Sequence, residues 1–301
     1  MGQRPRKKGN TMRLSTMTNL FYEEREDKKN FLNSVRKTNA VGFKVMDFCM
    51  CPFQRHETEM LGDDWEERTY EIANEAAKLG VEFSQSHLLY AKPLTRRKTA
   101  ADEGCEQNEF FIWATQRAIR ISAMLGVKWA VVHPVQLKED ADLERDIKYN
   151  HEIYDKYVEL ASSLGVGLAF ENMADVDNKR RFGVTADELN ALVDSFGSQY
   201  VGACWDFGHG NRVFADQPTQ LIKLGSRLKA THVDDNVGKD DLHIIPFFGT
   251  VKWHDIMKAL HDINYGGDFN FELASCKRMP PELKQATVEY IYKIGEYLMS
   301  L

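Results

Sequence analysis

Residues 162–172 read SSLGVGLAFEN, and this stretch contains the unit that decides the fold. The leucine–glycine pair at 164–165 is typical of a helix end, because glycine adopts the left-handed conformation that closes a helix at little steric cost. The apolar run over 167–170 predicts a buried strand, and it ends at Glu171, whose carboxylate can bind a metal or carry a proton. Helix, glycine, apolar strand and reactive side chain, in this order, indicate one unit of a parallel α/β sheet.

The same order recurs along the chain. Further apolar runs end in a metal-binding or proton-carrying side chain: VEFSQSH (His87), WAVVHP (His133), GACWDFGH (Asp206 and His209), LKATHVDD (His232) and FNFEL (Glu272). With two more strands near the N-terminus the count is eight, and eight such units close into a barrel whose strands end at one mouth. We therefore expect an α/β fold with a single (β/α)8 TIM barrel as the catalytic domain over 12–301. A disordered basic tail is expected over 1–11.

The apolar periodicity also predicts the element boundaries. Strands are expected at 14–20, 41–48, 81–86, 129–133, 167–170, 201–205, 228–232 and 269–273. Helices are expected at 24–38, 63–79, 109–125, 143–164, 186–196, 218–224, 253–263 and 281–299. Two long loops are expected, a polar one over 91–103 and a functional one over 234–250.

The composition is that of an ordinary globular protein. Hydrophobic residues make up 43% of the 301 residues, which is enough for a large core. The formal net charge of -6 argues against nucleic acid as a partner, because phosphate backbones attract clustered Lys and Arg. No apolar run reaches the roughly 20 residues of a membrane span, so no membrane partner is expected. Five cysteines without a CxxC pair favour buried thiols in a reducing, cytoplasmic location over disulfides or a thiolate zinc site.

Four of the strand-end residues predict a metal centre. Glu171, Asp206, His232 and Glu272 each follow an apolar strand core by one step, so in a closed barrel their side chains would point at a common centre. Three carboxylates and one imidazole suit a single divalent ion with open positions for substrate oxygens, Mn²⁺ first and Co²⁺, Mg²⁺ or Zn²⁺ as alternatives. Any one of them alone could equally be a polar residue that caps a loop.

Histidines beside these ligands are candidates for proton transfer and substrate contact. His209 lies three residues after Asp206, and His133 is followed by Pro134, which fixes the turn after its strand. We assign both to catalysis together with Glu171 and Glu272. His87, and the Asp241–His243 pair in the long loop, are assigned to substrate binding. A histidine alone is more often a structural hydrogen-bonding group, and a D-x-H pair can be a solvated part of a loop.

Motifs for other chemistry are absent from the sequence. Neither GxGxxG nor GxxxxGK[ST] occurs, and no GxSxG is found, so nucleotide hydrolysis, dinucleotide hydride transfer and serine hydrolysis lack their usual signatures. Glu171 and Glu272 could form the carboxylate pair of a glycoside hydrolase, but metal ligation explains both better.

The succession HP, FEN, WDFGHGNR, THVDDN, D-x-H-x-x-P and a final FEL resembles the xylose isomerase-like barrel superfamily, especially its sugar phosphate isomerase and epimerase branch. The resemblance covers nearly the whole chain. It implies metal ligands at Glu171, Asp206, His232 and Glu272, the same four that their chemistry selects. It also implies that the two glutamates exchange protons with sugar carbons.

Endonuclease IV shares this scaffold and is a competing interpretation. The resemblance places its trinuclear zinc site on nine positions, and all of them carry the required ligand type: His87, His133, Glu171, Asp206, His209, His232, Asp241, His243 and Glu272. The acidic net charge and the lack of basic loops at the mouth argue against DNA binding. Three bound zinc ions would favour the nuclease, and one Mn²⁺ would favour the sugar enzyme.

One loop departs from the sugar isomerase pattern. Where those enzymes commonly show H-x-P-P-G-x-G-x-x-D-W, this chain reads HIIPFFGTVKW over 243–253, with Phe247 where a glycine is usual and Phe248 directly after it. The two rings could form an apolar wall for an aryl group or a partner subunit, and such a wall would point toward the C-glycoside deglycosidase relatives. Alternatively, they could anchor the loop on the barrel rim.

These observations predict a metal-dependent sugar isomerase or epimerase that removes a proton next to the carbonyl of a keto-sugar and forms an enediolate. A lyase acting on 3-keto-sugars shares this first step and is the main alternative, resembling a C-glycoside deglycosidase or an inosose dehydratase. A non-catalytic sugar sensor is a further alternative. The loss of one metal ligand would favour it, and no ligand is lost. The expected partners are a small sugar substrate and either a second copy of the chain or a small partner subunit.

Overall fold

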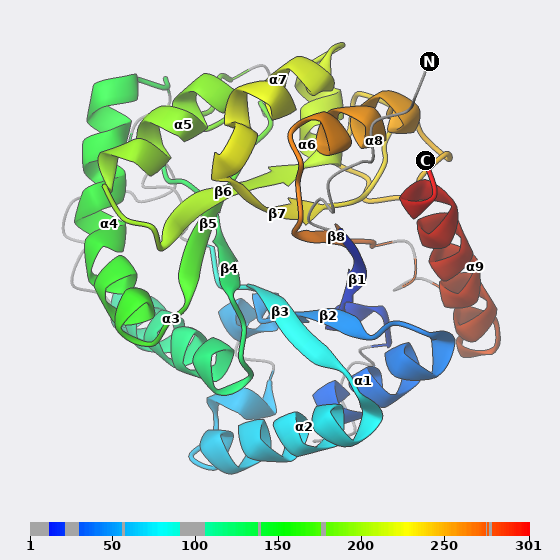
Figure 1. Ribbon diagram of the computed structural model, residues 1–301. Coiled ribbons are helices and arrows are strands. Elements are labelled where there is room, and N and C mark those ends of the chain that lie inside the picture. The colour runs from blue at the N-terminus through cyan, green and yellow to red at the C-terminus, as the bar shows by residue number, and fades with distance from the viewer. Residues whose placement is uncertain are drawn as a thin grey trace, which may run out of the picture.

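Eight parallel strands form a closed barrel at the centre of the molecule (Figure 1). The computed structural model describes residues 12–21, 30–55, 58–90, 106–137, 140–175, 179–274, 276 and 279–301. The sheet order is β7-β6-β5-β4-β3-β2-β1-β8, and a parallel bridge between Val233 and Phe271 joins its two edges. This confirms the predicted (β/α)8 barrel. The strands are β1 (Arg13–Met17), β2 (Val45–Cys49), β3 (Glu82–His87), β4 (Trp129–Val132), β5 (Gly167–Glu171), β6 (Val201–Asp206), β7 (Leu228–His232) and β8 (Asp268–Phe271).

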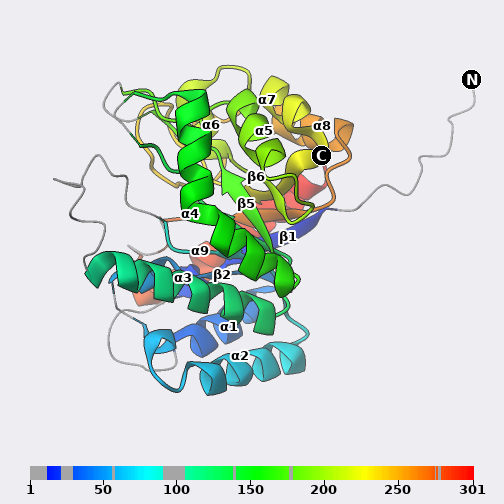
Figure 2. The same cartoon turned by 90° about the vertical axis from the view of Figure 1, so that its left-hand side faces the viewer.

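Helices surround the barrel on its outer side, and the side view shows α3 and α4 lying next to each other (Figure 2). The α-helices are α1 (Asn30–Val41), α2 (Trp65–Leu79), α3 (Glu106–Met124), α4 (Leu143–Ser163), α5 (Ala186–Ser195), α6 (Phe207–Val213), α7 (Gln217–Leu224), α8 (Trp253–Asp262) and α9 (Pro281–Met299). Short 3-10 turns cover η1 (Thr18–Phe21), η2 (Cys51–Arg55), η3 (Glu59–Leu61) and η6 (Gly225–Arg227). Gly80 ends α2 at a φ of 64°, the left-handed conformation that glycine adopts at little steric cost.

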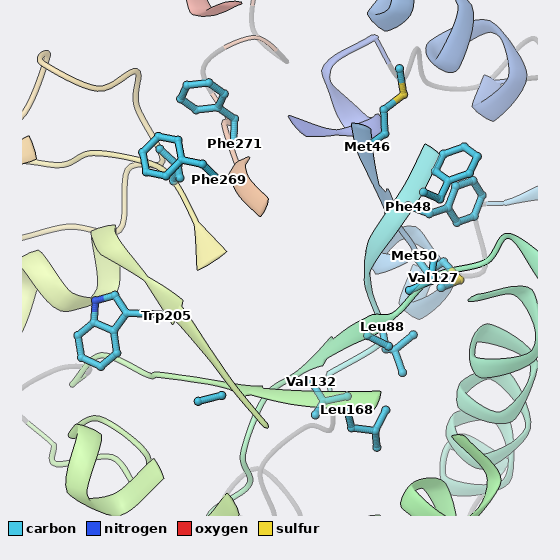
Figure 3. Close-up of a cluster of buried hydrophobic side chains, with 14 of the residues drawn as sticks. Met46, Phe48, Met50, Leu88, Val127, Val132, Leu168, Trp205, Phe269 and Phe271 are labelled. Atoms are coloured by element: carbon cyan, nitrogen blue, oxygen red, sulfur yellow. The ribbon is translucent and has the colours of Figure 1, made fainter. Parts of the chain in front are cut away.

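The apolar core lies between the barrel and the helices. Figure 3 shows large side chains such as Trp205, Phe269 and Phe271 pointing outward from their strands, and all three are fully buried. Successive strand residues point to opposite faces, so the alternate residues face the inside of the barrel. Each fully buried side chain of this size contributes roughly 2–3 kcal/mol to folding.

The inside of the barrel is polar along one side. On four neighbouring strands, Ser15 donates to Asn270 Oδ1 (3.0 Å), and Gln85 and Asn270 both donate to Asp47 Oδ2 (2.8 and 3.3 Å). Opposite them, a separate apolar cluster of small side chains contains Val131, Ala169, Cys204 and Ala230. Burial, the largest effect, raises the pKa of Asp47 to about 6, although the imidazoles of His232 and His87 lower it.

Several predicted boundaries were wrong by a few residues. The first strand ends at Met17 and continues as a 3-10 turn, and the second begins only at Val45 because α1 runs to Val41. A seven-residue helix that the sequence did not predict, α6, follows β6, and the side chain of Asp206 caps it by accepting from the His209 backbone N–H (2.6 Å).

Some predictions concern the edges of the chain and its loops. The predicted basic tail over 1–11 and the polar loop over 91–103 lie outside the described residues, as does the start of the helix expected at 24–38. The domain boundary at residue 12 stays a prediction. Within the described residues, no helix combines the length and apolar character that a bilayer span requires.

Candidate metal centre

The four predicted metal ligands meet at the carboxyl-terminal mouth of the barrel. Glu171, Asp206 and His232 are the last residues of β5, β6 and β7, and Glu272 directly follows β8. One ligand atom from each lies within 4.8 Å of the ligand atoms of the other three. His232 Nδ1 is 2.8 Å from Glu272 Oε2 and 3.3 Å from Glu171 Oε1. The barrel geometry therefore brings together side chains from four separate strands.

The chemistry of this cluster fits a divalent cation. Glu171, Asp206 and His232 are buried, whereas the Glu272 side chain is 17% exposed. Asp206 Oδ2 and His232 Nε2 are buried and have no hydrogen-bond partner among the described residues. A buried polar atom without a partner costs about 1–3 kcal/mol, so a cation bound here would remove that cost. Buried groups of His, Glu and Asp at this mouth thus have the composition and burial of a divalent metal site.

Two more groups of potential ligands flank the first and overlap with it. On one side, His87 Nε2 and His133 Nε2 lie 3.5 and 3.2 Å from Glu171 Oε2 and 3.3 Å from each other. On the other side, Asp241 Oδ2 lies 3.5 Å from His209 Nε2 and 3.3 Å from His243 Nε2.

These three groups form a continuous row across the mouth. The geometric sets of potential ligands are His87, Glu171 and His232; then Glu171, Asp206, His232 and Glu272; then Asp206, His209 and His243. Glu171 belongs to the first and second sets, and Asp206 belongs to the second and third. All the polar side chains singled out from the sequence therefore lie in one continuous cluster.

Mutual electrostatics set the charges of this cluster. Burial by itself raises the pKa of Glu171, but the imidazoles of His232 and His133 outweigh it and hold that pKa well below its usual range. His232 likewise lowers the pKa of Glu272 against the effect of burial. Burial works against a charged His232, yet the surrounding Cys204, Glu272 and Glu171 raise its pKa well above 6.5. A metal ion that binds His232 must therefore displace a proton from it.

His87 and His133 have opposite electrostatic tendencies. Burial opposes a charge on both, but the carboxylates of Glu171 and Glu272 outweigh it at His87 and raise its pKa to about 10. Burial prevails at His133 and lowers its pKa. His87 can thus donate a proton toward the neutral ring of His133, which can act as an acceptor.

Asn172 holds two of the strand ends together. Its Oδ1 accepts from the Asp206 backbone N–H (2.5 Å), and its Nδ2 donates to the Asp206 carbonyl (3.0 Å). Its own carbonyl lies 2.8 Å from His209 Nδ1, which leaves His209 Nε2 to face Asp241. Sequence reasoning missed this role, although Asn172 is the last letter of the FEN motif.

Asp235 organises the loop that carries His243. Its carboxylate accepts from the backbone N–H of Phe247 and Val251 and from Trp253 Nε1, each at 3.0 Å. A short antiparallel bridge between Asp235 and Ile244 places His243 beside the mouth. No local pattern indicates that Asp235, the second acidic residue of THVDDN, has a structural role.

The sequence is similar to a known protein family over most of its length. The family described as xylose isomerase-like TIM barrel matches residues 35–294. The chain belongs to this family. It is 40% identical over 81 residues to an uncharacterized protein of Sinorhizobium fredii and 26% identical over 185 residues to one of Methanocaldococcus jannaschii. The matches span 27% and 60% of this chain and 26% and 61% of those relatives.

Epimerases are among the other proteins to which this chain is similar. A D-psicose 3-epimerase of Enterocloster bolteae is 26% identical over 117 residues, which span 35% of this chain and 37% of that protein. The structure of D-psicose 3-epimerase with D-tagatose from Clostridium cellulolyticum has a TM-score of 0.71 at 16% identity and covers 96% of this chain and 99% of that one. The 3-keto-D-glucoside 4-epimerase of E. coli has a TM-score of 0.67 at 15% identity, covering 94% and 100%. These structures establish the shared fold.

Phe247 and Phe248 pack against α9 in this member of the family. Their side chains are 46% and 61% exposed, and their rings contact Tyr297 (5.9 Å) and Tyr290 (6.4 Å) on α9. Their assignment to substrate binding stays a prediction. An aromatic ring that sequence reasoning missed is nearer: Tyr90 stacks on His133 at 5.1 Å between centroids.

Proposed function

We propose that this protein is a divalent-metal-dependent sugar epimerase or isomerase acting on a keto-sugar, with Mn²⁺ as its first candidate ion. The observation that carries the proposal is the four-ligand set of Glu171, Asp206, His232 and Glu272 at the mouth of a barrel of the xylose isomerase-like family. The epimerase fold of the similar structures supports the choice of reaction class.

The two glutamates differ in a way that suits them to proton transfer. When bound, a divalent ion would supply Lewis-acid polarisation of a carbonyl. Glu272 is partly exposed and its carboxylate is held ionised by His232, so it can reach and accept a proton from a carbon next to that carbonyl. Glu171, buried deeper and 3.5 Å from the protonated ring of His87, would relay a proton from that ring to the other side of the sugar carbon, which inverts its configuration.

The remaining polar residues would bind and orient the substrate. His133 and His209 would place hydroxyl groups or move protons between oxygens, and His87, Asp241 and His243 would complete the polar wall. The side chains of His133 and His243 are 19% and 20% exposed, so a sugar could contact both. Loss of a β-substituent after the same first step would make the protein a lyase.

Hydrogen exchange tests the proposal directly. The Mn²⁺-loaded protein is incubated with keto-sugars in D₂O, and deuterium is sought at the carbon next to the carbonyl. We expect incorporation together with a new epimer, and loss of both in Glu272→Gln but not in Glu282→Gln, an exposed glutamate at the start of α9. Release of a β-substituent, without formation of a new epimer, would indicate the lyase. Full activity of Glu272→Gln would reject the acid–base assignment.

The row of three overlapping ligand groups favours a second candidate, a phosphodiester-cleaving enzyme similar to endonuclease IV. The number of metal ions per chain distinguishes the two. One ion measured by elemental analysis supports the sugar enzyme, whereas three ions together with cleavage of abasic DNA would support the nuclease.

A further inference from the structure

A cavity of about 480 Å³ opens at the amino-terminal end of the barrel, away from the candidate metal centre. The first residues of several strands line it, including Arg13 of β1, Trp129 of β4 and Asp268 of β8. The loops that precede β7 and β8 complete its wall through Ser226 and Gly266. Because the metal ligands stand at the other ends of the same strands, the cavity is separate from the proposed active site.

Two glycines on neighbouring strands give this cavity its shape. A Cβ atom at Gly167 of β5 would lie 2.3 Å from the ring of Trp129, and one at Gly202 of β6 would lie 2.3 Å from Lys229 Cγ. The side chain of Trp129 therefore covers Gly167, and that of Lys229 covers Gly202. The Lys229 ammonium stands 5.7 Å from the centroid of the Trp129 ring, a cation–π arrangement that holds the charge at the cavity wall.

The cavity lining carries more positive than negative charge. Its charged residues are the cations Arg13, Lys128 and Lys229 and the single carboxylate of Asp268, a formal surplus of two positive charges (three minus one) in a chain of net charge -6. Asp268 is already engaged, since its Oδ1 lies 2.9 Å from Arg13 Nε and its Oδ2 accepts from Ser84.

The two lysines differ from Arg13 in their ion pairs. Arg13 pairs with both Asp268 and Glu82, but within the described residues no ion pair involves Lys128 or Lys229. Lys128 is exposed at the rim and Lys229 is half-buried in the wall, so one ammonium can meet a ligand at the entrance and the other inside. Two unpaired ammonium groups in one concave site attract anions, and Lys binds phosphate as a point charge.

We propose that this cavity binds a small molecule through a compact anionic group, a phosphate or a carboxylate, held by Lys229 and Lys128. Its volume lies in the range of small-molecule sites, roughly 300–1,000 Å³. Hydroxyl and amide groups of Ser226 and Asn264 line the same wall and can bond to the polar remainder of such a ligand. The site does not depend on the reaction at the opposite mouth.

Calorimetric titration of the metal-loaded protein tests this site. Inorganic phosphate is the probe for the phosphate arm and succinate is the probe for the carboxylate arm. We expect at least one to bind, with an affinity that falls about ten-fold or more in Lys229→Met, which keeps the apolar stem and removes the charge. The matched control is Lys258→Met, which removes an exposed lysine of α8 that pairs with Asp262 outside the cavity.

Two results would overturn the proposal. One is the absence of binding of both probes. The other is binding that survives in both Lys229→Met and Lys128→Met but disappears after chelation, because the anion would then sit at the metal centre. Lys128 is exposed, so its variant tests the site even where Lys229→Met perturbs the fold, which circular dichroism would reveal.

Discussion

Replacing Asp47 by asparagine should remove one pH-dependent loss of stability. Asp47 is fully buried inside the barrel, and its Oδ2 accepts from Gln85 and Asn270 while its Oδ1 has no partner. Its folded pKa of about 6 lies above the 3.8 of the unfolded chain. The folded state therefore holds the proton more tightly, so the stabilisation is complete below the unfolded pKa and is lost as pH rises through the folded pKa.

The size of the effect follows from these two pKa values. A shift from 3.8 to about 6 corresponds to about 3 kcal/mol over the whole window, at 1.36 kcal/mol per pKa unit. Between about pH 4.5 and about pH 7.5 the loss is about 2 kcal/mol, because the unfolded carboxyl is already mostly ionised at the lower pH. Asparagine has the shape and charge of the protonated acid, so it keeps the two accepted hydrogen bonds and does not ionise.

Urea unfolding of the metal-free protein at several pH values measures this difference. The stability of Asp47→Asn relative to the wild type should rise by about 2 kcal/mol from about pH 4.5 to about pH 7.5. Asp240→Asn, which removes an exposed carboxylate from the loop after β7, should show no such trend. A relative stability of Asp47→Asn that does not change with pH would refute the argument that Asp47 is protonated in the folded barrel.

Three further predictions concern packing, helix capping and metal binding. Gly208→Ala would place a Cβ 1.8 Å from Asp234 Oδ1, so we expect a loss of about 1–3 kcal/mol in thermal unfolding, and an unchanged melting temperature would show that the loop adapts freely. Thr185→Ala breaks the capping box with Glu188 at the start of α5 and should cost about 1 kcal/mol by urea unfolding, whereas an unaltered midpoint would mean that the box contributes nothing. Saturating Mn²⁺ at about 100 times its Kd should stabilise the protein by about 2.7 kcal/mol, and its affinity should weaken as pH falls because binding displaces a proton from His232. Metal affinity that is independent of pH would contradict that last expectation.

Sequence alone determined the barrel and its mouth. Apolar runs that end in Glu171, Asp206 and His232 define strands by local physics, because burial on both faces of a parallel strand requires continuous apolar residues. The glycine that closes α2 likewise acts through its own backbone conformation. Such signals are local, so they can be recognised without the tertiary structure. The convergence of the strand ends follows from the repeat itself.

Only the tertiary structure decided what lies between those signals. The role of Asn172 in joining two strand ends, and of Asp235 in holding a loop, depends on partners far away in the chain. The same holds for the rings of Phe247 and Phe248, which the sequence places in a loop but which pack on α9 about 50 and 42 residues further along. The position of Lys229 in its cavity likewise depends on other strands, because its stem lies over Gly202 and its ammonium lies near the ring of Trp129. These contacts are fixed by packing between distant segments, and no local pattern of residues encodes them.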